Sequence, residues 1–192
     1  MLDSITQSYV LQSILSFDQT YLGYMESLRQ PLLTDIILAI THIGDPVVLF
    51  LITALTLLLL WMRKKSVEVI VFALAMFGGA GVVWITKHLV ARPRPLGIIA
   101  ETGYSFPSGH ALVSSIFFPL ILYIFKHAVP AGWKRKTFLS VGVLLMITVV
   151  LSRPYIGVHY LSDVIAGLLI GLLISSFAIL IIEGYHRKHD NI

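Results

Sequence analysis

Five long apolar segments constrain this chain more than any other feature of its sequence. They lie at residues 46–62, 67–87, 110–125, 138–151 and 160–182. A membrane-spanning helix needs roughly 17–25 largely apolar residues, and three of these segments are near the lower limit or carry a few polar residues. Hydrophobic residues make up 57% of the chain and charged residues only 12%, against about 45–50% and about 25% in soluble domains. The sequence therefore predicts an all-α integral membrane helical bundle.

The first 45 residues are harder to assign. Residues 31–44 are apolar, but a stretch of 14 suits a buried, interfacial or re-entrant helix better than a full span. His42 and Asp45 are interpreted as ending this helix, or alternatively as lining a substrate entrance. Two topologies stay open, with five spans and an outer N-terminus or with a sixth, partial span. The predicted divisions are an interfacial segment 1–45, a transmembrane domain 46–185 and a cytoplasmic tail 186–192.

The basic residues indicate which way the bundle faces. With five spans, nine lysines and arginines fall on one side, in residues 63–65, residues 126–136 and the C-terminal segment, and five fall on the other. An excess of Lys and Arg marks the cytoplasmic side. The segments 88–109 and 152–159 are then predicted to lie outside, in what the compact size and short loops suggest is a bacterial cytoplasmic (inner) membrane.

Three polar clusters lie at the predicted outer ends of the spans. They read KHLVARPRP from Lys87, SFPSGH ending at His110, and SRPYIGVHYLSDV from Ser152. Ionisable residues near the membrane are costly and by default mark a functional site. Because all three clusters fall on one face, the fold can bring them together.

The basic and small residues of these clusters suit a phosphoryl group. Lys87, Arg94 and Arg153 supply three cations, and arginine in particular matches phosphate oxygens bidentately. Ser108 can donate a hydroxyl hydrogen bond, and Gly109 permits close approach of the backbone. Free N–H groups at the start of the following helix would also point towards an anion.

The histidines and Asp163 suggest a division of chemical labour. His159 and Asp163 are four residues apart and would share one face of a helix. A carboxylate that binds one imidazole nitrogen fixes the tautomer and leaves the other nitrogen free to attack. His159 is therefore the candidate nucleophile and His110 the candidate general acid, which together predict a bell-shaped pH profile. The chain has no cysteine, so a thiolate nucleophile is excluded.

These three motifs resemble those of the type 2 phosphatidic acid phosphatase superfamily. Its pattern is Lys, six residues, Arg-Pro; then Pro-Ser-Gly-His; then Ser-Arg, five residues, His, three residues, Asp. The sequence is similar to all of it, through Lys87, Arg94, Pro95, Pro107, Ser108, Gly109, His110, Ser152, Arg153, His159 and Asp163. The resemblance implies a phospho-histidine mechanism, an extracytoplasmic site and no need for a metal or other cofactor. Members of the membrane branch often have six spans, and the first is not evident here.

The predicted activity is removal of the terminal phosphate from a lipid phosphate or diphosphate of the outer leaflet. Candidate substrates are phosphatidic acid, phosphatidylglycerol phosphate and undecaprenyl diphosphate, and no nucleic-acid partner is expected. A non-catalytic lipid-phosphate binder or transporter is the first alternative, and a haloperoxidase that needs vanadate is the second. A zinc site formed by His110, His159 and Asp163 is disfavoured, because three nearby cations would repel a divalent metal.

Four further residues near the motifs have open roles. Arg92 could add a fourth phosphate contact or simply lie at the membrane interface, and His88 is interpreted as a boundary residue. Glu101 and Tyr104 could contact a headgroup or form a lid. The small residues of GLLIG (167–171) are typical of helix packing, either within the chain or between two copies.

Overall fold

Helices account for all the regular secondary structure between residues 2 and 189, which are the residues that this computed structural model describes. The all-α fold class is confirmed, and the predicted tail extends three residues, 190–192, beyond the described part. The elements are α1 (Leu2–Ser27), α2 (Pro31–Thr41), the short 3₁₀ helix η1 (His42–Gly44), α3 (Pro46–Met62), α4 (Ser66–Val90), α5 (Gly109–Phe125), α6 (Trp133–Tyr155) and α7 (Leu161–His189).

Three of the described helices, α4, α6 and α7, are each long and apolar enough to cross a membrane. The segment formed by α2 and η1 qualifies together with α3, but the two are bent by 43°, as in a broken span or a re-entrant loop. Helix α5 is apolar but has only 17 residues. The described residues thus give three candidate spans, or four with the bent pair, and the predicted count of five or six is not confirmed.

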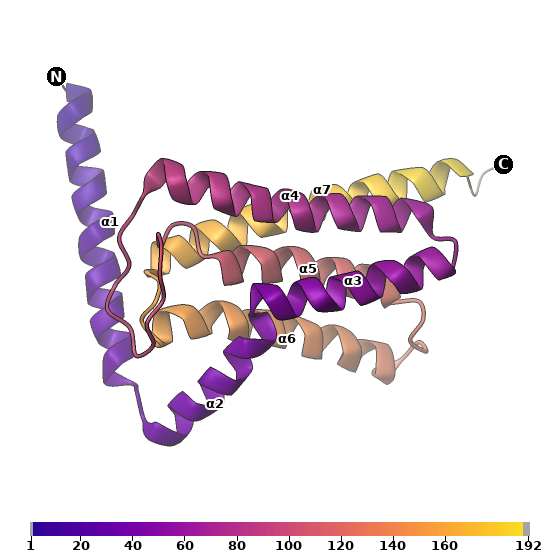
Figure 1. Ribbon diagram of the computed structural model, residues 1–192, viewed down its shortest axis with the longest axis horizontal. Helices are drawn as coiled ribbons and strands as arrows, with labels where there is room; N and C mark the ends of the chain where they lie inside the picture. The colour runs from indigo at the N-terminus through magenta and orange to yellow at the C-terminus, as the bar shows by residue number, and fades with distance from the viewer. Residues whose placement is uncertain (1, 190–192) are drawn as a thin grey trace.

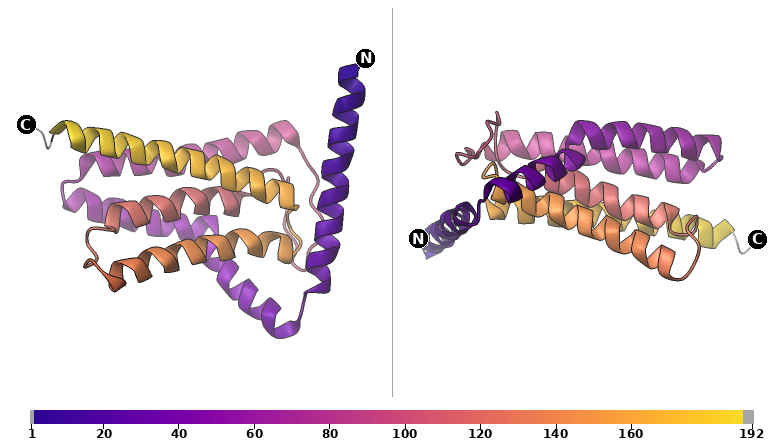
Figure 2. Two further views of the ribbon diagram at one scale, coloured as in Figure 1. Left: turned by 180° about the vertical axis from the view of Figure 1, so that it is seen from behind. Right: turned by 90° about the horizontal axis from the view of Figure 1, so that it is seen from below.

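Helices α3 to α7 lie side by side as a bundle, and α1 crosses one end of it (Figure 1). The segment 91–108 and the turn between α6 and α7 lie at the end that α1 crosses. The α3–α4 turn, the α5–α6 connection and the end of α7 lie at the opposite end, as the view from behind also shows (Figure 2). The bundle therefore separates the predicted phosphate-binding segments from the short basic loops.

Helix α5 forms the centre of the bundle. Leu112, Ile116 and Leu120 on this helix are completely buried, and α5 packs against α4, α6 and α7. Gly167 and Gly171 allow α7 to approach closely, because a Cβ atom there would lie 2.6 Å from the Ser108 carbonyl oxygen and 2.5 Å from that of Leu112. The GLLIG segment therefore serves packing within the chain.

The outward faces of the bundle are apolar. Leu51 on α3, Leu74 on α4 and Leu173 on α7 expose 67%, 69% and 71% of their surface. Exposed apolar patches on this scale mark a surface that contacts a membrane or a partner. Together with the long apolar helices, they fit a bundle surrounded by lipid.

The N-terminal region differs from the simple segment predicted for it. Residues 2–27 form one long helix, α1, and Pro31 begins α2 after a short break. Asp45 ends this region by capping α3, since its Oδ1 accepts a hydrogen bond of 2.8 Å from the Val47 N–H. Asp45 therefore begins α3, since a carboxylate at this position satisfies a free N–H of the first turn. Of the two residues interpreted as ending the short N-terminal helix, His42 is the one at the C-terminal cap of α2.

Candidate active site

The predicted site residues come together at the end of the bundle that α1 crosses. Arg94 contacts His159 across 65 positions of the chain, at 3.0 Å between Nη1 and Nε2. The Ser108 N–H donates to the Asp163 carbonyl oxygen at 3.0 Å. The two contacts join the segment after α4, the start of α5 and the start of α7, so the fold unites the three sequence clusters.

His159 has a defined tautomer in this arrangement. A guanidinium group can only donate hydrogen bonds, so Nε2 of His159 must accept from Arg94 and is unprotonated. The proton of the neutral ring is then on Nδ1, which lies 3.6 Å from Oδ2 of Asp163. The lone pair of Nε2 therefore points towards the guanidinium group of Arg94, where a nucleophile would meet a bound phosphate.

The His159–Asp163 pair forms differently from the sequence prediction. His159 lies in the turn before α7, not on the helix itself, so the two residues do not share a helix face. The pair forms because Asp163 is in the first turn of α7, where its Oδ2 also accepts from the Tyr160 N–H at 3.0 Å. A carboxylate that caps its own helix start is held in one orientation.

Two arginines form an oxyanion site beside His159. Arg153 is only 1% exposed, and its Nη2 donates to Oε1 of Glu101. Arg94 contacts the other oxygen of the same carboxylate, with 2.9 Å between Nη1 and Oε2. A carboxylate held by two guanidinium groups occupies the kind of site that also suits phosphate oxygens.

The other predicted phosphate-binding residues surround this site less directly. Lys87, in the last turn of α4, donates through Nζ to the Tyr104 carbonyl oxygen. Ser108 caps α5 by accepting from the Ala111 N–H at 3.4 Å. A Cβ on Gly109 would meet only Val83, at 3.6 Å, so packing within the chain does not explain a glycine there. His110 is partly buried at the start of α5.

Burial and neighbouring charges determine the ionisation of His159 and Glu101, two titratable groups that lie in the loops of the site. Burial lowers the pKa of His159 to about 4, helped by the positive charges of Arg94 and Arg153 and opposed by Asp163. Burial alone would raise the pKa of the Glu101 carboxyl, but Arg153 and Arg94 hold it below its ordinary value. At neutral pH the site therefore contains a neutral imidazole beside an ionised carboxylate.

Arg92 has neither of the two roles predicted for it. Its guanidinium bridges two buried carboxylates, with 2.7 Å to Oδ2 of Asp18 and 2.7 Å to Oδ1 of Asp163. Asp18 was not predicted from the sequence to belong to the site. The available signal was an acidic residue in an otherwise apolar stretch, which by default indicates a functional position.

His88 lies apart from the oxyanion site. Its Nδ1 is 2.7 Å from the Trp84 carbonyl oxygen one turn earlier, and its ring packs against Trp84. The interpretation of His88 as a boundary residue at the end of α4 fits these contacts.

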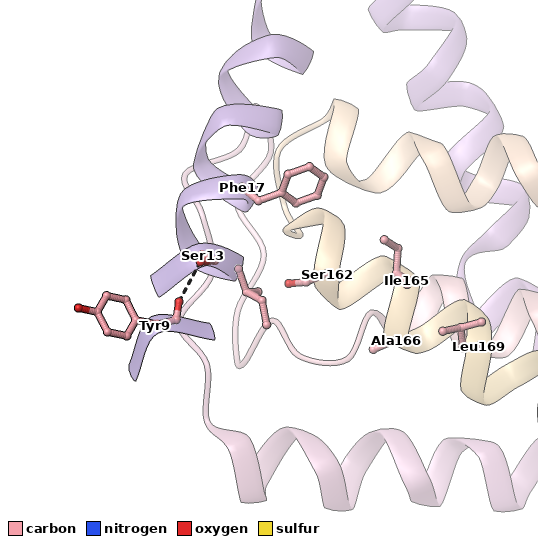
Figure 3. Close-up of a pocket in the computed structure, with 8 residues that line it drawn as sticks. Tyr9, Ser13, Phe17, Ser162, Ile165, Ala166 and Leu169 are labelled. Carbon is pink, nitrogen blue, oxygen red and sulfur yellow. Dashed lines mark hydrogen bonds between the residues drawn. The ribbon is translucent and has the colours of Figure 1, made fainter. Parts of the chain in front are cut away.

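An apolar groove separates residues 9–17 of α1 from α7. It has a volume of about 630 Å³, and Phe17 on α1 faces Ser162, Ile165 and Leu169 on α7 across it (Figure 3). None of the predicted site residues lines this groove. Ser162, however, is the chain neighbour of Asp163, so the groove ends next to the His159–Asp163 pair.

Metal ligands are not assigned by the geometry. Among residues 2–189, no three His, Cys, Asp or Glu side chains are grouped so that they could hold a metal ion. The predicted independence from metals remains a prediction that only an activity measurement can test.

The fold and the site together define a helical membrane protein in which a buried histidine–aspartate pair faces a two-arginine oxyanion site. Residues 68–187 match the model of the family described as the PAP2 superfamily. The match covers more than half of the chain, so the chain belongs to this superfamily, and the resemblance drawn from the three motifs is confirmed. Membership of this superfamily, together with the long apolar helices, identifies the chain as an integral membrane protein.

The relatives include a bacterial and an archaeal protein. The chain is 27% identical to phosphatidylglycerophosphatase B of Bacillus subtilis over 165 residues, which cover 84% of this chain and 79% of the relative. It is 29% identical to an undecaprenyl-diphosphatase of Sulfolobus acidocaldarius over 156 residues, covering 77% and 69%. The fold is similar to the crystal structure of a transmembrane PAP2-type phosphatidylglycerolphosphate phosphatase from Bacillus subtilis, with a TM-score of 0.80, 24% identity and coverage of 92% and 87%.

Proposed function

We propose that this protein is a membrane phosphatase that removes the terminal phosphate of a lipid phosphate or diphosphate through a phospho-histidine intermediate, without a metal. One observation carries the proposal. The unprotonated Nε2 of His159 accepts from Arg94 at 3.0 Å, and the same Arg94 nitrogen binds an anionic oxygen of Glu101 at 2.9 Å. A phosphate in place of that carboxylate would lie beside the lone pair of the nucleophile.

In the first chemical step Arg94 shifts its hydrogen bond from Nε2 of His159 to the phosphate, and the released lone pair forms a bond to the phosphorus atom. The bond to the leaving lipid oxygen breaks, and His110 donates the proton that this oxygen takes up. Arg94 and Arg153 stabilise the charge on the equatorial oxygens, with Lys87 as a further cation. Asp163 stabilises the positive charge that develops on His159. The distance between Nδ1 of His159 and Oδ2 of Asp163 would shorten for this from 3.6 Å to hydrogen-bond length.

The second step reverses these roles with water. His110 accepts a proton from a water molecule, whose oxygen attacks the phosphorus of the phospho-histidine. The P–N bond breaks, Nε2 of His159 recovers its lone pair, and inorganic phosphate leaves. Each cycle therefore consumes one water and returns both histidines to their starting protonation states.

Glu101 has to leave the two arginines before phosphate can bind. Replacing it with the neutral Glu101→Gln weakens the internal contact, since charge-assisted hydrogen bonds exceed neutral ones by about 1–1.5 kcal/mol. The inhibition constant for inorganic phosphate is expected to fall about tenfold in this variant. Glu26→Gln removes an exposed carboxylate whose partner is Arg29 and should leave the constant unchanged. An unchanged constant in Glu101→Gln would contradict the shared site.

The pH profile should reflect the low pKa of His159. Attack requires the neutral ring, so the rate falls only when the ring becomes protonated, and burial places that pKa near 4. The acidic limb of kcat/KM is therefore expected near pH 4, after correction for the substrate phosphate, which titrates near pH 6. The substrate titration can be followed separately by phosphorus NMR. A corrected limb at pH 6.5, the value of a free imidazole, would contradict a buried nucleophile.

The names of two relatives help to narrow the candidate lipid substrates. Phosphatidylglycerol phosphate and undecaprenyl diphosphate are supported by the names of two relatives, and phosphatidic acid is retained from the motif resemblance. A competition assay with all three lipids on one purified preparation ranks them. Absence of phosphate release from each lipid would favour a non-catalytic lipid-phosphate binder.

The orientation follows from the distribution of basic residues. The site is proposed to face the extracytoplasmic side of a bacterial inner membrane, because the basic loops lie at the other end of the bundle (Figure 1) and mark the cytoplasmic side. Reporter fusions within segment 91–108 test this orientation. A reporter that is active only in the cytoplasm at that position would overturn it.

A further inference from the structure

Asp18, Arg92 and Ser162 form a buried polar cluster behind the catalytic pair. The side chain of Asp18 is 0% exposed and that of Arg92 is 15% exposed. Asp18 accepts from the Ser162 backbone N–H at 2.9 Å and also from the Ser162 hydroxyl. An acidic side chain of α1 thereby caps the first turn of α7, where carboxylates are favoured.

Arg92 connects this cluster to Asp163. Nη2 binds Asp18 and Nη1 binds Oδ1 of Asp163, both at 2.7 Å. Its guanidinium also lies over the Tyr160 ring, 4.1 Å from the ring centre. The planar fork is thus fixed on three sides, a geometry that lysine cannot reproduce.

The contact with Arg92 completes the orientation of the Asp163 carboxylate. Oδ2 accepts from the Tyr160 N–H and faces His159, which leaves Oδ1 as the oxygen that Arg92 holds. Burial makes Asp18 and Asp163 costly neighbours unless the cation between them is present. Loss of Arg92 would therefore let Asp163 turn away from His159 or take up a proton.

The second half of α1 is the part that meets the bundle, and Met25 there packs against Tyr155, Ile156 and Val158. The apolar groove separates Tyr9 and Phe17 from α7 (Figure 3). Beyond the end of α1, Arg29 donates through Nε to the Tyr155 carbonyl oxygen at 3.0 Å. Asp18 is therefore the contact through which α1 reaches the catalytic pair, whereas Arg29 anchors the same region to α6.

We propose that Arg92 and Asp18 are positioning residues that orient Asp163, and through it His159, so that α1 completes the active site. The inference rests on the proposed phosphatase function. Neither residue contacts the oxyanion site formed by Arg94 and Arg153. Their effect is expected on the rate of the chemical step and not on phosphate binding.

The test compares Arg92→Gln, Asp18→Asn and the double variant, each normalised to the amount of folded protein measured by size-exclusion chromatography. Arg92→Gln is expected to lower kcat at least about thirtyfold with KM within about twofold, the pattern of an interaction needed only in the transition state. Asp18→Asn should lower kcat less than Arg92→Gln does, because Arg92 still binds Asp163. The double variant should exceed Arg92→Gln in kcat, since it removes one of two unpaired carboxylates. Arg92→Lys should recover part of the loss.

Arg29→Gln is the matched control, because it loosens the same region without touching Asp163. Its kcat per folded molecule should stay within about twofold of wild type even if its melting temperature falls. Equal kcat in Arg92→Gln and wild type, or a raised inhibition constant for inorganic phosphate at unchanged kcat, would overturn the inference and leave the proposed function intact. A wild-type protein that releases no phosphate would overturn the proposed function, and this inference with it.

Discussion

His159→Asn is expected to reduce phosphate release from the lipid substrate by about four orders of magnitude or more, the scale seen when a nucleophile is removed. Asparagine retains a side-chain N–H that can face Asp163, so the pocket is disturbed little. It lacks the Nε2 lone pair that accepts from Arg94. The loss should appear in kcat, measured as inorganic phosphate released by purified protein in detergent.

His127→Asn is the control for this variant. His127 lines a separate pocket with Lys65 and Glu68 at the opposite end of the bundle and should retain wild-type activity. Turnover of His159→Asn above about one tenth of wild type would exclude His159 as the nucleophile, because no other group could replace a covalent step so efficiently.

Arg153→Lys is expected to lower kcat/KM about 100-fold, which corresponds to about 2.7 kcal/mol of transition-state stabilisation. The charge is kept, but the planar fork that binds two partners is lost. Arg153 uses that fork to reach Glu101 through Nη2 and Thr41 through Nη1, the latter at 3.0 Å. Lysine can serve one of these partners as a point charge, so the oxyanion site loses its geometry.

Arg135→Lys provides the matched comparison. Arg135 also uses two nitrogens, but on a single carbonyl oxygen of Val129 in the α5–α6 connection, far from His159 along the bundle. Its kcat/KM should be unchanged. A loss smaller than about threefold in Arg153→Lys would show that charge alone is sufficient and that the bidentate geometry does not matter.

The apolar pattern predicted the helices of the bundle well because the membrane imposes a simple rule on sequence. Residues 46–62 match α3 (Pro46–Met62) in full, and residues 110–125 differ from α5 by one position. Helices α4, α6 and α7 extend beyond their apolar cores at one or both ends, since polar residues can continue a helix past the hydrocarbon region. The number of spans could not be read from the same pattern, because α5 is short and is covered by its neighbours.

The residues of the candidate site could be predicted because they are concentrated in short motifs. His159, Arg94 and Arg153 meet as the spacing indicated, and the structure adds which nitrogen of His159 is unprotonated. The role of Arg92 was not predictable, since its partner Asp18 is 74 positions away on a helix that the sequence pattern did not define. The contact of Glu101 with Arg94 and Arg153 was not predictable either, because it depends on the path of segment 91–108.

In the proposed mechanism His159 carries the phosphoryl group during turnover. A rapid acid-free quench of wild-type protein with lipid substrate labelled in its terminal phosphate, followed by proteolysis and mass spectrometry, tests it most directly. A labelled phosphate is expected on the peptide that contains His159. It should be absent in His159→Asn and should form in the presence of a metal chelator. Label on another residue, or lipid hydrolysis with no labelled protein at any quench time, would contradict it.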